Sequence, residues 1–205
     1  MEHTKILNGN DLLKSPLITK TYVCAEAIKW LRSNKEKSIL ELWSTCPEPD
    51  WMMWVLTKKI RAPKWPGKEK IQRILLRLVE QYALPHTSQG YEYCYRAVMT
   101  AYLHLKNLRD TEELRTAIEK IDAGVETSEY TDTTIHAHHT ISYACWACMR
   151  TVTNTNYPAG CAVRGVVRTM ESCTKSFKDP KKEIAYWIRN EVTIPITVPT
   201  TDAKL

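Results

Sequence analysis

The sequence predicts an all-α fold, a single domain of about eight or nine helices. Three observations support this class. Apolar residues recur at the i, i+3, i+4 and i+7 spacing of a helical face in most segments of the chain. Capping residues, prolines and glycines stand where these segments begin or end. The sequence contains no apolar–polar alternation of useful length for a strand and no fixed-period repeat.

The size and composition of the chain are those of one globular domain. It has 205 residues, of which 43% are hydrophobic and 25% are charged, and only 6 are glycine. A packed interior can be built from this composition, and the length suits a single core. We therefore expect one helical domain over 1–205, with extended or flexible termini at 1–18 and 192–205.

The N-terminal part is expected to contain short helices separated by prolines. A first helix is predicted over 21–32, with a face made by Cys24, Ala27, Ile28 and Leu31. Ser38 and Glu41 have the spacing of a capping box, which opens a second helix. Pro47 and Pro49 end it, and Asp50 is placed to cap the next. The rings expected to anchor these short helices to the body are Trp43, Trp51 and Trp54.

Longer helices are predicted in the rest of the chain, over 68–82, 90–107, 111–124, 134–151, 158–177 and 180–191. The clearest amphipathic face consists of Ile71, Ile74, Leu75, Leu78 and Val79. In the next helix the residues expected to face inward are Tyr91, Cys94, Tyr95, Val98, Tyr102 and Leu105. Thr111 is expected to cap the following helix and Gly124 to end it. Small residues in 134–151 and 158–177 indicate two helices packed closely at the centre.

Targeting signals and cysteine usage predict a cytoplasmic protein. The first residues lack a basic segment followed by an apolar one, and no stretch approaches the length that spans a bilayer. The cysteines are odd in number and lie mostly within apolar helical patterns, as expected of buried free thiols. They are Cys24, Cys46, Cys94, Cys145, Cys148, Cys161 and Cys173.

The sequence contains no GxSxG, HExxH or Walker motif and no glycine-rich turn after a strand. We therefore interpret the chain as a non-enzyme and expect no cofactor.

One group of potential ligands consists of His136, His138, His139, Cys145 and Cys148. If this segment is helical, His138 and Cys145 share a face while His136 points elsewhere, and no second cysteine pair completes four ligands. Structural zinc sites usually place a CxxC in a turn with a matching pair downstream. Buried thiols beside a histidine-rich helix start are therefore favoured over zinc, and over a cysteine nucleophile activated by histidine.

A cationic segment is the best surface candidate. Its members are Lys58, Lys59, Arg61, Lys64, Lys68, Lys70, Arg73 and Arg77, with Glu69 as the one acid among them. Two readings use these charges, docking on an acidic protein and neutralising phosphates with aromatic stacking. A third is a plain solvated helix face. The net charge of +6 fits all three. The predicted partner-binding residues are Lys58, Lys59, Arg61, Lys64, Trp65 and Lys68.

Two stretches carry a resemblance to a known family. Cys24–Trp30 and Leu40–Leu56, the latter reading LELWSTCPEPDWMMWVL, are similar to a family of immunity proteins of bacterial toxin systems and phages. The specific part is Trp43–Leu56, and the resemblance extends in outline over Tyr22–Arg189. It implies an all-helical fold that acts by binding a protein, with no catalytic residues to carry over. The Lys, Thr and Tyr content departs from the Ala, Arg and Glu of that family and suits a phage gene.

These observations lead to three functional hypotheses. The first is a non-catalytic inhibitor that occludes a partner protein, either a toxin or a host defence protein. The alternative is a nucleic-acid-binding module that uses the basic 58–77 segment. The third is a metal-dependent enzyme at the histidine–cysteine group between His136 and Cys148. A phage-encoded inhibitor would act in the cytoplasm of the host cell.

Overall fold

The computed structural model describes residues 8–19, 23–57, 67–87, 90–126, 131–149, 156–173 and 178–192. Within these ranges the regular structure is helical, and the β structure is limited to an isolated antiparallel bridge between Asn8 and Ser38. The all-α prediction is confirmed, with a slightly higher number of helices than expected. The helices are α1 (Gly9–Lys14), α2 (Pro16–Thr19), α3 (Ala25–Ser33), α4 (Ile39–Thr45), α5 (Pro49–Thr57), α6 (Lys68–Tyr82), the 3₁₀ helix η1 (Leu84–His86), α7 (Tyr91–Leu105), α8 (Thr111–Glu126), α9 (Asp132–Met149), α10 (Asn156–Ser172) and α11 (Pro180–Glu191).

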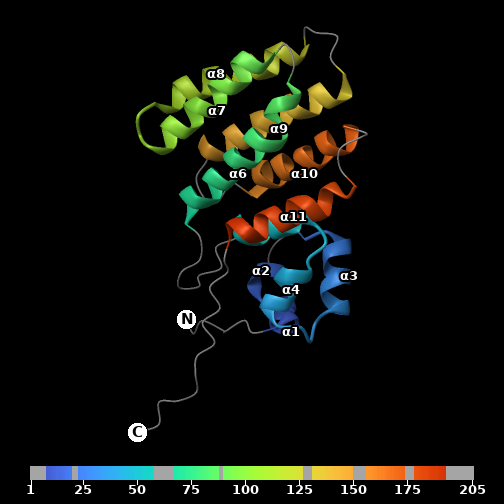
Figure 1. Ribbon diagram of the computed structural model, residues 1–205. Coiled ribbons are helices and arrows are strands. Elements are labelled where there is room, and N and C mark those ends of the chain that lie inside the picture. Colours follow the sequence, from blue (N-terminus) through green and yellow to red (C-terminus); the bar gives the residue numbers. More distant parts are fainter. Residues whose placement is uncertain are drawn as a thin grey trace.

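The helices are stacked in layers (Figure 1). The α7–α8 hairpin lies at one end and packs on α9, while α6 crosses beside α9. Next come α10 and α11, with α5 packed against both. The short helices α1 to α4 lie at the opposite end. The order is that of helix on helix, with each amphipathic face buried against the next layer.

The centre of the stack is the α9–α10 pair, which makes the most extensive helix contact among the described elements. Small side chains allow the two backbones to approach, as the sequence indicated. Ala137 and Ala144 of α9 and Ala159 and Ala162 of α10 are all fully buried. The two helices approach closely at Gly165, because a Cβ built there would lie 3.0 Å from the Thr140 Cβ and closer still to its hydroxyl oxygen.

The N-terminal end differs from its prediction. Residues 9–19 form α1 and α2, where the sequence predicted an extended or flexible terminus. The Asn8 side chain caps α1 by accepting from the Asp11 amide at 3.0 Å. The backbone amide of Gly9 also donates to the Lys37 carbonyl at 3.0 Å, which ties α1 to the turn after α3. The second of these contacts is tertiary and leaves no local sequence pattern.

Two expectations about α7 and α8 are wrong. Tyr91 and Tyr95 were expected to face inward, but 48% and 40% of their surfaces are exposed. The buried positions of α7 are Cys94, Ala97, Val98 and Ala101, so the buried face is narrower than the apolar pattern suggested. In addition, Asp110 rather than Thr111 caps α8, because its Oδ1 accepts from the Glu113 amide at 2.8 Å.

Gly124 does not end α8, which continues to Glu126. A residue without a Cβ is needed at this position, because the Tyr93 hydroxyl packs against it. A Cβ at Gly124 would lie 2.6 Å from that oxygen, and one at Gly90 would lie 2.5 Å from it and overlap His138 Nε2. The two glycines thus make room for the Tyr93–His138 contact between α7 and α9.

Candidate partner-binding surface

Most of the predicted partner-binding residues belong to one segment of the chain. Lys58, Lys59, Arg61, Lys64 and Trp65 belong to 58–66, which lies outside the described residues. Lys68, the last of the predicted set, is the first residue of α6. What the structure shows of this surface is therefore its α6 side.

Along α6, the cations differ in how they are paired. Arg73 donates to Glu69 with its Nη2 at 2.6 Å from Oε1, and Arg77 donates to Glu191 of α11 at 2.6 Å. Lys68 and Lys70 form no ion pair with any described carboxylate. Among the described residues, the uncompensated positive charge of the helix is thus concentrated in its first turn, next to segment 58–66.

The start of α6 has no side-chain cap, a feature that it shares with α3 and α7. The Ser38 hydroxyl and the Asp179 carboxylate cap α4 and α11, whereas Gly67 gives α6 no side-chain cap. A helix start carries partial positive charge and unpaired backbone amides. Each of the two lysines in that turn, half-buried Lys68 and exposed Lys70, therefore costs about 0.3–1 kcal/mol of helix stability. Lys68 and Lys70 occupy positions that an acidic residue would stabilise.

This arrangement can attract an anionic surface. Two lysines, the backbone amides of the first turn and the dipole of a 15-residue helix present positive charge in one place, while the Glu69 carboxylate of the same turn is paired with Arg73. A carboxylate-rich protein face and a phosphate backbone both meet that requirement.

The histidine–cysteine group has three buried members, His138, Cys145 and Cys148. His138 is fully buried; its Nδ1 is 2.7 Å from the Thr134 carbonyl oxygen and its Nε2 is 3.2 Å from the Tyr93 hydroxyl. Cys145 and Cys148 are buried in the core cluster. Within the described ranges no three His, Cys, Asp or Glu side chains lie together as a metal site would need.

The buried thiols are poor nucleophiles. Burial raises the pKa of the Cys94 and Cys148 thiols to about 12, and that of Cys46 to about 11. Burial also raises the pKa of Cys145 well above its ordinary range. Since the thiolate is the reactive form, these four side chains act as small apolar groups at neutral pH.

Stability is expected to fall in acid because of His138. Its pKa is lowered below the ordinary value of about 6.5, chiefly by burial, and the neighbouring charge of His139 adds to this. Below about pH 6.5, His138 therefore binds a proton in the unfolded chain but stays neutral in the folded chain until the pH falls to its lowered pKa. Urea unfolding should show a free energy that decreases by up to about 1.4 kcal/mol per pH unit from this group.

Two variants make the test specific. His138→Asn, which keeps a donor toward Thr134 O, should lose this part of the acid slope, while His139→Asn at the exposed neighbour should retain it. An unchanged slope in His138→Asn would assign the acid sensitivity to other groups.

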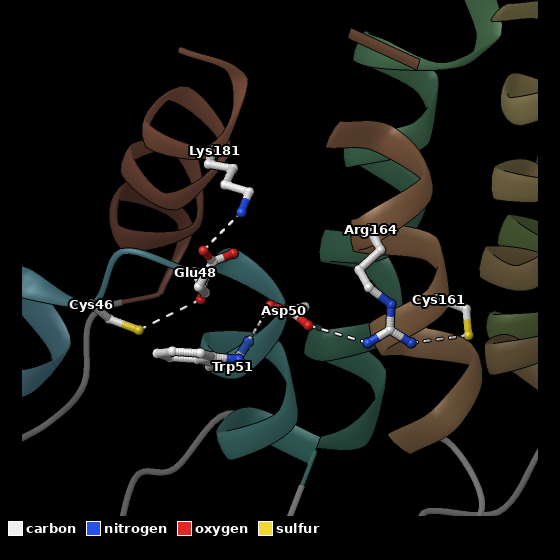
Figure 2. Close-up of polar contacts among 7 residues, drawn as sticks. All are labelled: Cys46, Glu48, Asp50, Trp51, Cys161, Arg164 and Lys181. Atoms are coloured by element: carbon white, nitrogen blue, oxygen red, sulfur yellow. Dashed lines mark hydrogen bonds and ion pairs between the residues drawn. The ribbon is translucent and has the colours of Figure 1, made fainter. Parts of the chain in front are cut away.

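A polar joint at the start of α5 includes Cys46, Glu48 and Asp50 of the Trp43–Leu56 segment (Figure 2). Lys181 of α11 binds Glu48 at 2.8 Å, and Arg164 of α10 binds Asp50 at 3.1 Å. The Cys46 thiol donates to the Glu48 carbonyl at 3.5 Å. These contacts place α5 between α10 and α11.

A second arginine completes this joint. Arg189 of α11 donates to the carbonyl oxygens of Trp43 and Cys46, at 3.2 and 2.7 Å. It thereby caps the end of α4 from another helix, with charge-assisted hydrogen bonds. Trp43 itself is buried and Trp51 contacts Trp30 at 6.0 Å between ring centroids. Trp43 belongs to the core cluster and Trp51 packs against it, as expected of rings that anchor short helices, while Trp54, the third ring of that expectation, is half-buried.

Sequence reasoning missed one further pair. The Cys173 sulfur lies 3.4 Å from Nδ1 of His86, on a residue 87 positions away. Because no motif links such distant residues, the sequence offered no signal for it. Desolvation raises the pKa of Cys173, which keeps this thiol protonated at neutral pH.

Comparison with protein-family models, curated proteins and solved structures gives no significant match. The described helices include none with the length and apolar character needed to cross a bilayer.

Proposed function

We propose that the protein is a non-catalytic inhibitor that binds an acidic face of a partner protein and occludes it. The partner is a toxin, as for an immunity protein, or a host defence protein, as for a phage counter-defence factor. Binding uses the start of α6 together with Lys58, Lys59, Arg61, Lys64 and Trp65 of the preceding segment.

The observation that supports this proposal is the uncompensated lysine pair in the first turn of α6. Lys68 and Lys70 oppose the helix dipole and have no ion pair with a described carboxylate, whereas Lys181 and Lys182 at the start of α11 are both paired. Charges that cost stability and receive no internal compensation are characteristic of surfaces selected for binding. The resemblance of the Trp43–Leu56 segment to immunity proteins points to the same class.

The proposal predicts opposite effects on binding and on stability. In Lys68→Glu/Lys70→Glu, the partner captured from a lysate of the native host and then purified should bind about tenfold more weakly or worse by calorimetry. The same variant should be more stable to urea by roughly 0.5–2 kcal/mol, because carboxylates suit a helix start.

The control is Lys29→Glu/Lys178→Glu, which makes the same change of net charge at exposed positions outside this surface. It should bind the partner as the native chain does. If both variants bind the partner equally well, the α6 start is not the docking surface. The native chain, added in an equimolar amount, should also block the activity of the purified partner. This result distinguishes occlusion from simple association.

The alternative function is nucleic-acid binding by the same cations. Uncompensated lysines also neutralise phosphates, and affinity would then fall steeply as salt rises. However, Arg73 and Arg77 are held in ion pairs with Glu69 and Glu191, so fewer charges of the 58–77 segment remain for a phosphate backbone. A gel shift with single- and double-stranded probes that shows no retention at low salt would eliminate this alternative.

A further inference from the structure

Helix α7 exposes a row of large apolar side chains. Tyr91, Tyr95 and Met99 follow one another at i, i+4 and i+8, with 48%, 40% and 37% of their surfaces exposed. The rings of Tyr91 and Tyr95 are stacked, with centroids 5.9 Å apart and planes 10° from parallel. The row forms one continuous strip along the helix rather than scattered contacts.

This strip borders a groove between α7 and α8. The groove has a volume of about 580 Å³, and its walls include Tyr95, Met99 and Leu103 of α7 and Thr116 and Ala117 of α8. The opposite sides of both helices are buried against α9. Among the described elements, α7 and α8 form the outermost layer of the stack (Figure 1).

The charges around the groove are nearly balanced, unlike those of the whole chain. Its charged lining residues are Glu92, Arg96, Arg109, Glu113 and Lys120, that is, three cations and two carboxylates. The chain as a whole carries +6. Glu92 is 2.8 Å from Arg96, and Arg109 is 2.6 Å from Glu113. Both signs are therefore present on one small surface.

We propose that a second copy of this chain docks on this groove, so that two α7–α8 hairpins pack face to face about a two-fold axis. In such an interface the same surface serves both partners, so it must be complementary to itself. A rim carrying cations and carboxylates together meets this condition. A surface of one sign would repel its own copy, and the α6 start, with its two uncompensated lysines, is of that kind.

The chemistry of the strip fits the same occupant. Tyr, Met and Arg are enriched at protein interfaces, and Tyr95, Met99 and Arg96 stand together here. Near a two-fold axis, residues meet their own copies, so flat tyrosine rings and a flexible methionine would pack against each other across it. Because this surface lies on different helices from Lys68 and Lys70, the inference is independent of the proposed function.

Sedimentation equilibrium of the full chain over a wide concentration range tests this. The native chain should reach a mass of twice 23.7 kDa. Met99→Glu should raise the dimer dissociation constant by about hundredfold or more, because two carboxylates would be buried without partners. Arg96→Glu, at a side chain with 75% of its surface exposed, should weaken the dimer, because it replaces the Glu92–Arg96 ion pair of each copy with two carboxylates that face those of the other copy.

The control is Tyr186→Glu, at a tyrosine on α11 that is 65% exposed and lies outside the groove. It should leave the dimer unchanged, and circular dichroism should show the native helix content in every variant. Three results would overturn the proposal: a native chain that is monomeric throughout, a dimer insensitive to both groove variants, or equal dissociation by Tyr186→Glu.

Discussion

Gly165→Ala is expected to destabilise the protein by about 3 kcal/mol, which is at the upper end for overpacking at a buried contact. The new methyl group would lie 3.0 Å from the Thr140 Cβ and nearer to its hydroxyl oxygen. Thr140 is fully buried and its hydroxyl donates to the His136 carbonyl, so the side chain has no free position to rotate into. The clash must therefore push α9 and α10 apart, at the centre of the stack.

The same helix provides a matched control. A Cβ at Gly160 would lie 3.9 Å from the nearest atom, the flexible end of Arg164. Gly160→Ala is therefore expected to stabilise the protein by roughly 0.5–1 kcal/mol, the usual gain from replacing glycine within a helix. Urea unfolding of both variants measures the difference, and similar free energies for the two would refute the close approach.

A double-variant cycle locates the clash. In a Thr140→Ala background, the hydroxyl oxygen closest to position 165 is gone, and the Cβ and Cα of residue 140 remain nearby. Gly165→Ala should then cost clearly less than in the native chain, with a coupling of about 1–2 kcal/mol. Full additivity of the two changes would place the strain elsewhere.

Local signals in the sequence were sufficient for much of the fold. The Ser38–Glu41 capping box is present with both of its hydrogen bonds. The five apolar positions predicted for the face of α6 are all buried. These features depend only on residues within two turns of each other, so spacing alone identifies them.

Other features depend on residues distant in the chain. Gly124 looked like a helix end, but it is needed because Tyr93 packs against it from α7. The exposure of Tyr91 and Tyr95 follows from how α7 is rotated against α9, which the apolar pattern does not specify. The bond between Arg164 and Asp50 spans 114 positions. Such relations appear only when the helices are placed together.

The candidate binding surface could be predicted from the sequence only in part. A run of cations was visible in the sequence, but the pairing of Arg73 with Glu69 and of Arg77 with Glu191 was not. Pairing separates the structural arginines from the uncompensated lysines at positions 68 and 70. Among the four described cations of the segment, the structure thereby separates Lys68 and Lys70 from the paired Arg73 and Arg77, while Lys58, Lys59, Arg61 and Lys64 lie outside the described residues.

Gln72 is the second position where a large loss is expected. Its side chain is 2% exposed and its Nε2 donates to the carbonyl oxygens of Ala147 and Cys148, at 3.0 and 3.1 Å. These carbonyls belong to the last turn of α9, where no intrahelical donor is left for them. Gln72 therefore caps α9 from a helix more than 70 positions earlier in the chain.

Gln72→Met preserves the volume of the side chain but removes both hydrogen bonds. Two buried acceptors then lose their side-chain donor, which should cost about 3 kcal/mol in urea unfolding. Gln81→Met makes the same change at an exposed position of α6, where water replaces the bond from Trp187, and it should cost less than about 1 kcal/mol. Hydrogen exchange should localise the Gln72→Met loss to the last turn of α9. Equal losses at the two glutamines would show that the hydrogen bonds to the buried carbonyls are not what makes Gln72 important.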